Sequence, residues 1–251
     1  MSYTTIQPCE ELKAYISHFW VATWQEQLPA AGSTYYVTAS SLTELAFGFA
    51  GPDLMWSSAQ GHTCNHGQYP AGGFYGLFGV SMYSHAVPAL FHLPASELND
   101  RFLSLDTLLG NDGKMMEERI AMAANTQERI GILTGYFMAQ VKREKLRDSL
   151  ISNAARYIRI HSGMANIVNI SRTCCLSQKQ FERRFKAFTG FNPKLYARIV
   201  RFETTLNNYA RYHSLTEAAH ANGYYDQAHF IRDFRTFAGY SPVRFLELSG
   251  Y

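Results

Sequence analysis

A short stretch of the sequence carries three side chains that could bind a metal ion. His62, Cys64 and His66 occupy alternate positions in His62-Thr63-Cys64-Asn65-His66. If this stretch is a strand, the three side chains share a face, and imidazole and thiolate ligands suit a soft transition metal. The alternative is that the histidines pack or form hydrogen bonds on a sheet face. Because no fourth ligand is evident, we expect no bound cofactor.

The neighbouring cysteines Cys174 and Cys175 could form a redox pair. Adjacent cysteines rarely form an unstrained disulfide, so small buried apolar residues are the favoured interpretation. The sequence contains no G-x-S-x-G, P-loop, H-E-x-x-H or dinucleotide-binding motif. We therefore predict that the protein is not an enzyme.

Composition limits the class of protein. The 251 residues are 47% hydrophobic and 17% charged, so a sizeable core is expected. No apolar run approaches the ~18 residues of a membrane span, and the N-terminus lacks a basic region followed by an apolar one. The four cysteines show no paired spacing. These features predict a cytoplasmic protein without a membrane partner.

Charge is divided unequally along the chain. Residues 1–149 contain 9 Lys/Arg and 14 Asp/Glu, a net charge of −5, whereas residues 150–251 contain 14 and 6, a net charge of +8. A basic C-terminal part is typical of a domain that meets a polyanion such as DNA, although a solvated basic surface is the alternative.

The basic part contains an internal repeat. Residues 177–193 and 226–242 share Gln, Phe, Arg, Phe, Phe, Gly and Pro at an offset of 49 residues. Ser177 and Asp226 are suitable helix N-caps, while Gly190 and Gly239 stand where a helix ends. Phenylalanines spaced i, i+4, i+7 form one buried stripe in each copy. Each copy is preceded by a short apolar helix, at 165–173 and 215–221, which predicts two helix-turn-helix units.

The face of each capped helix opposite its phenylalanines carries hydrogen-bonding and basic side chains. Arg and Gln can contact base edges, and Lys and Arg can hold phosphates. The candidate DNA-binding residues are Gln178, Lys179, Glu182, Arg183 and Lys186 in the first copy, and Gln227, Ala228, Ile231, Arg232 and Arg235 in the second. Between the copies, residues 193–212 predict one long helix, in which some 16 residues would span roughly 24 Å. Such a helix could set the two recognition helices about one DNA turn (~34 Å) apart.

The N-terminal part has a different pattern. In residues 43–49, Leu45, Phe47 and Phe49 alternate as on a strand, and residues 74–80 alternate again. Residues 126–141 predict an amphipathic helix with Thr126 as its N-cap. The aromatic residues that could line an apolar ligand pocket, or could equally be core, are Trp20, Trp24, Trp56, Tyr75 and Phe78.

The segment from about Ile151 to Phe245 resembles the DNA-binding domain of AraC/XylS-type transcription regulators. The resemblance rests on the run from Gly223 to Arg235, followed by Gly239 and Ser241-Pro242, and on Leu176-Ser177, residues 181–186, Gly190 and Pro193. It implies two helix-turn-helix units bridged by a long helix. The resemblance places DNA contacts on Lys179, Glu182, Arg183, Gln227, Ala228, Ile231 and Arg232.

The N-terminal part resembles a domain of unknown function that is often joined to this DNA-binding domain. The matching stretches are residues 12–20, 44–47, 61–63 and 93–98. By analogy with AraC-type regulators we expect an α+β chain. It would have a mainly β sensor-like domain of cupin-like barrel or sandwich type at 1–110, a helical linker that could dimerise at 111–149, and the all-α double helix-turn-helix domain at 150–251.

The leading hypothesis is therefore a sequence-specific, double-stranded-DNA-binding regulator whose N-terminal domain senses a small-molecule effector. Activation is the working expectation for its action, and repression is the open alternative. In one alternative the N-terminal domain only mediates assembly, for example into a homodimer through residues 115–141. In another the chain is a methyl-accepting DNA-repair enzyme fused to a regulator, which would need a zinc-binding cysteine cluster. Only Cys9 and Cys64 are available for that cluster in the N-terminal part.

Overall fold

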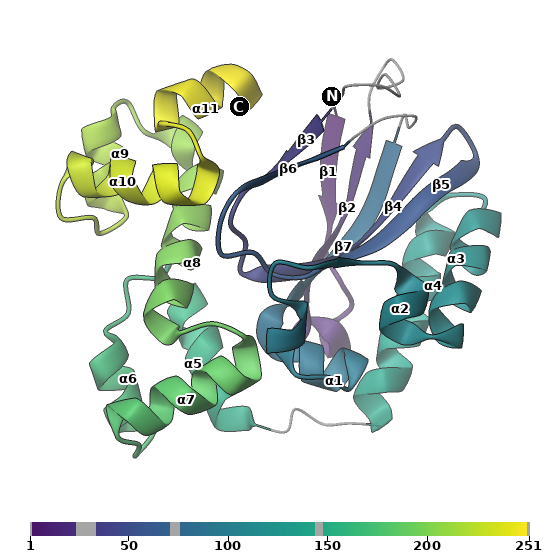
Figure 1. Cartoon of the computed structure of the whole chain (residues 1–251), viewed down its shortest axis with the longest axis horizontal. Helices are drawn as coiled ribbons and strands as arrows, with labels where there is room; N and C mark the ends of the chain where they lie inside the picture. Colours follow the sequence, from purple (N-terminus) through teal and green to yellow (C-terminus); the bar gives the residue numbers. More distant parts are fainter. Residues whose placement is uncertain (1, 24–33, 71–75, 144–147, 250–251) are drawn as a thin grey trace.

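The computed structural model describes residues 2–23, 34–70, 76–143 and 148–249. A sheet with its own helices is followed by a second, helical part (Figure 1). The predicted fold class, mainly β at the N-terminus and all-α at the C-terminus, is confirmed. Within the described ranges, none of the helices is long and apolar enough to cross a membrane.

Six strands form one antiparallel sheet in the order β1-β2-β7-β4-β5-β8, and two more pair as β3-β6. The strand bounds are β1 Ser2–Ile6, β2 Ile16–Thr23, β3 Thr34–Val37, β4 Leu42–Ala50, β5 Asp53–Gln60, β6 Gly67–Pro70, β7 Gly76–Tyr83 and β8 Phe102–Leu103. The strand predicted at 43–49 lies within β4, and the described part of the stretch predicted at 74–80 lies within β7.

One face of the sheet packs against helices of the same part. Phe47 is paired with Phe78 and Leu45 with Val80, and all four side chains are buried. Helices α1 and α4 complete this core, as Figure 1 shows. The short elements here are η1 Glu10–Leu12, η2 Ser84–Ala86, η3 Ala95–Leu98, α1 Val87–Phe91 and α2 Leu105–Leu109, and the longer helices are α3 Asn111–Met122 and α4 Thr126–Arg143.

The apolar face of helix α4 packs against the core of the N-terminal part. Ile130, Leu133 and Phe137 are buried in the same core as the sheet, so this face is covered within one molecule. The helix begins at Thr126 as expected, but its cap is Asn125, whose Oδ1 accepts a hydrogen bond of 3.0 Å from the Glu128 amide. The N-cap prediction was therefore one residue late.

The helical part has one core shared by both repeat copies. Its elements are α5 Ser149–Ile160, α6 Ile167–Thr173, α7 Gln178–Thr189, α8 Pro193–Asn207, η4 Tyr209–Arg211, α9 Leu215–Ala221, α10 Gln227–Ala238 and α11 Pro242–Ser249. The long connecting helix ends at Asn207 rather than near residue 212, because the chain tightens into the η4 turn. Its 15 residues span about 22 Å, close to the expected length.

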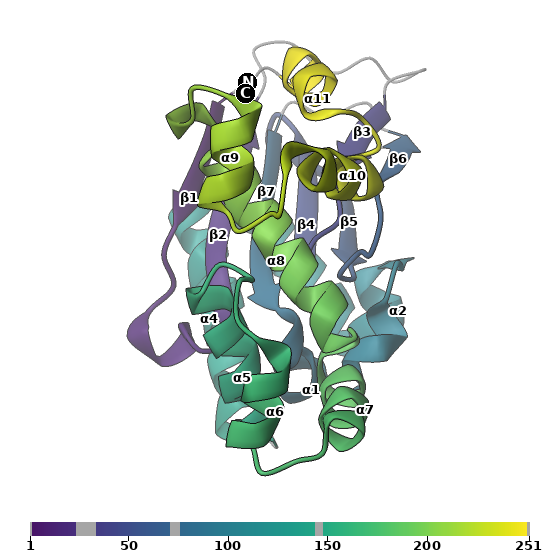
Figure 2. The same ribbon diagram turned by 90° about the vertical axis from the view of Figure 1, so that its left-hand side faces the viewer.

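The helical part meets the N-terminal part at η2, at η3 and at the stretch before β4, and α8 runs diagonally in front of the sheet in Figure 2. Glu203 on α8 accepts hydrogen bonds of 2.7 Å from both the amide and the hydroxyl of Ser41, just before β4. Arg159 on α5 donates to the same hydroxyl at 2.7 Å and lies 3.7 Å from Glu203. This partly buried ion pair therefore joins α5, α8 and the sheet.

Candidate nucleic-acid interface

The two repeat copies form helices that are capped at equivalent positions. Helix α7 begins at a capping box in which Ser177 and Gln180 satisfy each other's backbone amides. Helix α10 begins at Asp226, which accepts a hydrogen bond of 2.6 Å from the His229 amide. They end at Gly190 and Gly239, with φ of 81° and 74°, a left-handed conformation that glycine adopts without strain. The repeat in the sequence is thus a repeat in the structure.

The phenylalanine stripe points inward in both copies. Phe181 and Phe185 are fully buried on α7, as are Phe230, Phe234 and Phe237 on α10. The third residue of the α7 stripe, at position 188, is half-buried instead. The opposite faces of both helices are therefore free to meet another molecule.

The candidate DNA-binding side chains lie on those opposite faces. The exposed ones are Gln178, Lys179, Arg183, Lys186, Gln227, Ala228, Arg232 and Arg235, and the half-buried ones are Glu182 and Ile231. Gln178 donates to the Glu182 carboxylate at 3.0 Å, which orients both side chains on α7. Hydrogen-bonding, cationic and apolar groups together suit base edges and phosphates.

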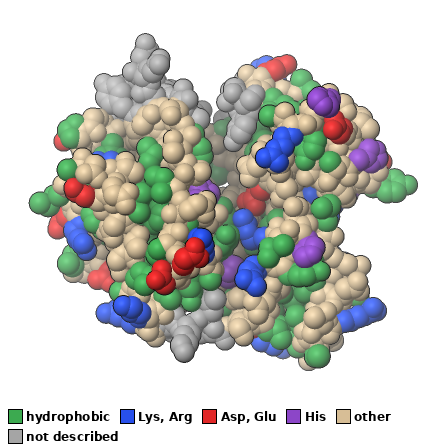
Figure 3. All heavy atoms as spheres, turned by 180° about the vertical axis from the view of Figure 1, so that it is seen from behind, with side chains coloured by type: hydrophobic (Ala, Val, Ile, Leu, Met, Phe, Trp, Pro, Cys, Tyr) green, Lys and Arg blue, Asp and Glu red, His purple; other side chains and the backbone are tan. Residues whose placement is uncertain are grey.

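Charge on the surface is mixed. Figure 3, which views the molecule from behind, shows Lys and Arg dispersed among acidic and uncharged side chains over both parts. Each recognition helix instead offers a local group of exposed cationic side chains, such as Lys179 and Arg183 on α7 and Arg232 and Arg235 on α10. Affinity for DNA would therefore come from several separate phosphate contacts.

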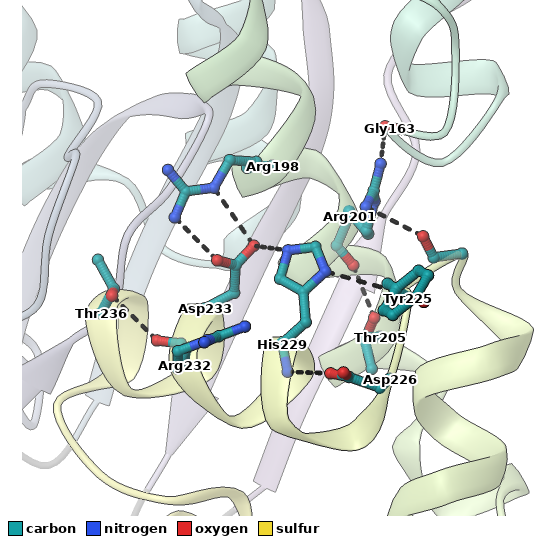
Figure 4. A network of polar contacts seen from close by, with 11 residues as sticks. Gly163, Arg198, Arg201, Thr205, Tyr225, Asp226, His229, Arg232, Asp233 and Thr236 are labelled. Atoms are coloured by element: carbon teal, nitrogen blue, oxygen red, sulfur yellow. Dashed lines mark hydrogen bonds and ion pairs between the residues drawn. The ribbon is translucent and has the colours of Figure 1, made fainter.

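The position of α10 depends on two arginines of α8 that the sequence analysis did not identify (Figure 4). Arg198 donates to both carboxylate oxygens of Asp233 at 2.8 and 3.3 Å, and Asp233 is 4% exposed. Arg201 donates to the carbonyls of Gly163 and Gly223, at 3.0 and 3.2 Å. The bond to Gly223 reaches the turn of the second unit. The sequence feature that could have identified Arg198 and Arg201 is their spacing of three residues on the connecting helix, which places both on one side of it.

The predicted metal ligands are not brought together. His62 and Cys64 flank Thr63, which forms an isolated bridge to Ser40, so the stretch is not a continuous strand with one shared face. His62 packs against Phe191 and His66 stacks on Tyr36. Over the ranges that the structure describes, we find no cluster of three or more His, Cys, Asp or Glu that could hold a metal ion. The metal-site hypothesis is therefore wrong for these residues.

The proposed aromatic pocket is divided between the two faces of the sheet. Phe78 belongs to the core under α4. Trp20 is paired with Gly79, the next residue along β7, and so lies on the second face, as does Trp56 opposite Gly48. Trp24 and Tyr75 lie outside the described residues. Added Cβ atoms at Gly48 and Gly79 would overlap the Trp56 and Trp20 rings, so both glycines make room for an indole.

The adjacent cysteines are unpaired and lie at the first helix-turn. Cys174 caps α6 and is half-buried, whereas Cys175 is exposed and has a left-handed φ of 54°. The expectation that both are buried is therefore wrong for Cys175, which is exposed and occupies the left-handed position of the tight turn. Gly223, with a φ of 68°, meets the same need in the second unit.

Comparison with known proteins agrees with this geometry. Residues 170–247 match the family described as a helix-turn-helix domain, and residues 4–104 match a domain of unknown function (DUF6597). No curated protein matches the sequence.

Solved structures of ToxT from Vibrio cholerae are similar in fold. The apo form of a ToxT variant has 12% identity and a TM-score of 0.50, with 91% of this chain and 97% of that chain covered. Wild-type ToxT bound to an unsaturated fatty acid has 12% identity and a TM-score of 0.46, with 93% and 96% covered. At such identities the likeness concerns the fold alone.

Proposed function

We propose that the chain, whose residues 170–247 match a helix-turn-helix family and whose residues 4–104 match DUF6597, is an AraC-type transcription regulator. In this proposal it binds one duplex sequence with α7 and α10 in successive major grooves. The observation that carries the proposal is the pair of helices capped at equivalent positions, each with buried phenylalanines on one side and exposed cationic side chains on the other. One helix could be a chance solvated surface. Two equivalent helices joined by one connecting helix can address two half-sites of one duplex.

The exposed side chains have separable roles. Arg183 and Arg232 occupy equivalent positions, and each is placed to donate two hydrogen bonds to a guanine. Lys179 is available for a phosphate or a guanine, and Ile231 for a thymine methyl group. Glu182 can accept from a cytosine amine. The remaining contacts, to adenine, thymine or phosphate, are assigned to Gln178, Lys186, Gln227, Ala228 and Arg235.

We also propose that the N-terminal domain senses a small molecule on the second face of the sheet. Trp20 and Trp56 lie on this face, and Nε1 of the buried Trp20 has no hydrogen-bond partner. A planar or apolar ligand with a hydrogen-bond acceptor would suit these groups. The same proposal divides the chain into parts at 1–110, 111–149 and 150–251. It also describes the protein as a cytoplasmic activator that does not act as an enzyme.

A role in assembly is the second candidate for the N-terminal part. Met115 and Met122 on α3 are 52% and 85% exposed, which leaves apolar surface for a second copy of the chain. Light scattering of the full chain would detect a homodimer. A stable dimer together with no stabilising compound in a thermal-shift screen would favour this candidate over a ligand sensor.

The DNA-binding proposal is tested by in vitro selection with the full chain. Duplexes enriched from a random library should contain two conserved blocks and should bind at ~150 mM salt at least ~10³-fold more tightly than scrambled duplexes. Arg183→Ala and Arg232→Ala should each relax preference in one block, whereas the exposed Arg244→Ala on α11 should not. Equal binding to selected and scrambled duplexes would refute the proposal.

A further inference from the structure

The N-terminal part touches the end of the first recognition helix. His62 is fully buried, and its ring lies 4.4 Å from that of Phe191, centroid to centroid. Asn99 donates a hydrogen bond of 3.0 Å to the Gly190 carbonyl. A Cβ at Gly190 would overlap Nε2 of His62 and Oδ1 of Asn99. The α7 C-cap is therefore in close contact with two polar side chains of the N-terminal domain.

The N-terminal part also touches the C-terminal end of α10, at the position equivalent to the α7 C-cap. Nδ1 of His66 donates to the Thr236 carbonyl at 3.3 Å. The Tyr36 ring stacks on His66 and lies 5.3 Å from Tyr240. A Cβ at Gly239 would overlap the Tyr36 hydroxyl and the His66 ring. Thus Gly190 and Gly239, which the 49-residue repeat makes equivalent, are both covered from outside the repeat.

The covering residues belong mainly to one structural segment, which we call the bridging segment and define as residues 36–40 and 62–66. Ser40 and Thr63 exchange two backbone hydrogen bonds, of 3.0 and 3.1 Å, which tie the two stretches together. The Ala39 amide donates to the Phe237 carbonyl at 2.9 Å, and Ala39 is buried in the core of the helical part. The bridging segment therefore places His62 at the C-terminal end of α7 and His66 at the C-terminal end of α10.

We propose that the bridging segment fixes the position of α10 relative to α7, so that the N-terminal domain determines which separation of half-sites the protein accepts. His62, His66, Tyr36 and Asn99 are positioning residues in this account, because none of them lies on the proposed DNA-contacting faces. The proposal rests on the proposed DNA-binding function and deepens it. It gives His62 and His66 a structural role in place of the metal binding that the sequence suggested.

Half-site spacing is a sensitive measure of this geometry. A shift of two base pairs moves one half-site by about 7 Å along the duplex and turns it by roughly 70°, since one turn takes about 10 base pairs and ~34 Å. Two recognition helices held rigidly can follow such a shift only if the DNA deforms. If α10 is released from the bridging segment, part of the mismatch can be taken up by the protein.

The test uses the full chain and duplexes that carry the two selected blocks at separations varied by one and two base pairs in each direction. The variant Tyr36→Ala/His66→Ala releases the second unit, and Asn99→Ala weakens the hold on the first. The matched control is Tyr157→Ala/His161→Ala, which removes another tyrosine–histidine pair, on α5, with ring centroids 4.0 Å apart. Circular dichroism and thermal unfolding establish that every variant is folded.

The wild type and the control should bind the best spacing at least ~10-fold more tightly than spacings two base pairs away, and the releasing variants less than ~3-fold more tightly. Binding to a duplex with a single block should be unchanged in all of them. If the releasing variants keep the wild-type spacing preference, α8 and the shared core suffice and the inference is overturned. If no protein binds selected DNA, the proposed function itself fails, which is a different result.

Discussion

The ion pair between Arg198 and Asp233 allows a quantitative test of how α10 is fixed to α8. Asp233 lies on the buried side of α10, with 5% of its side chain exposed, and accepts two hydrogen bonds from a guanidinium that is 43% exposed. Arg244 and Glu247 on α11 form a pair of similar length, 3.0 Å, but with side chains 59% and 56% exposed. The first pair is more buried, has two hydrogen bonds and joins two helices, whereas the second is an exposed pair with one hydrogen bond within one helix.

The expected coupling energies follow from that difference. A hydrogen bond to a charged group contributes about 1.5–3 kcal/mol, and solvent around the half-exposed arginine reduces this, so we expect a coupling of about 2 kcal/mol between Arg198 and Asp233. An exposed i, i+3 pair contributes about 0.5 kcal/mol or less, which is the expectation for Arg244 and Glu247.

Double-mutant cycles with alanine at each position measure these couplings directly from the free energy of unfolding in urea. Far-UV circular dichroism is the appropriate signal, because all three tryptophans lie within the first 56 residues and report on the other part of the chain. A coupling between Arg198 and Asp233 no larger than that between Arg244 and Glu247 would refute the argument that the buried, doubly hydrogen-bonded pair fixes α10 to α8.

Three other substitutions test base recognition on α10, the packing of Gly79 against Trp20 and the effect of burying His85. Arg232→Ala should cost about 1–3 kcal/mol at one base position of a selected duplex, measured with singly substituted duplexes. Gly79→Ala should destabilise by about 1–3 kcal/mol in urea, because its Cβ would overlap the Trp20 ring, whereas Gly76→Ala, with its nearest neighbour at 3.6 Å, should change stability by less than about 1 kcal/mol. Burial lowers the pKa of His85 from 6.5 to about 4. The unfolded chain therefore binds the proton first, and His85 should account for a loss of stability of up to about 3 kcal/mol between pH 6.5 and 4, in addition to the contribution of His62, whose pKa burial also lowers to about 4. His85→Gln should flatten that fall.

Each of these expectations has a contrary result. A uniform loss of affinity for every duplex would show that Arg232 contacts only phosphate. Equal effects at Gly79 and Gly76 would mean that the indole moves aside without cost. If the pH dependence of stability is the same in His85→Gln as in the wild type, the His85 imidazole does not contribute to acid sensitivity and other groups account for it.

The helical part was predictable because its signals are local. A cap such as Ser177 or Asp226 and a terminal glycine such as Gly190 or Gly239 act within one helical turn. The structure confirms both capped helices, and α9 occupies the range 215–221 that the sequence predicted. The same logic failed at the first turn, where an exposed cysteine adopts the left-handed conformation.

The errors in the N-terminal part arise from pairings that are distant in sequence. The metal-site hypothesis assumed a strand around His62, but that stretch is held by a single bridge to Ser40, which local alternation cannot reveal. The pocket hypothesis grouped Phe78 with Trp20, although strand pairing places them on opposite faces. Likewise, Arg198 becomes informative only once Asp233 is brought opposite it by folding.

The repeat also explains how one segment can control two units. Because α7 and α10 end in the same left-handed glycine, each presents a backbone surface without a Cβ, and a side chain from outside can approach closely at both ends. The two contacts are not equally buried, since His62 is fully enclosed and His66 is exposed. A ligand or partner that disturbs the bridging segment would therefore release α10 more readily than α7. In this way an event in the N-terminal domain could alter the geometry of DNA recognition without touching the recognition faces.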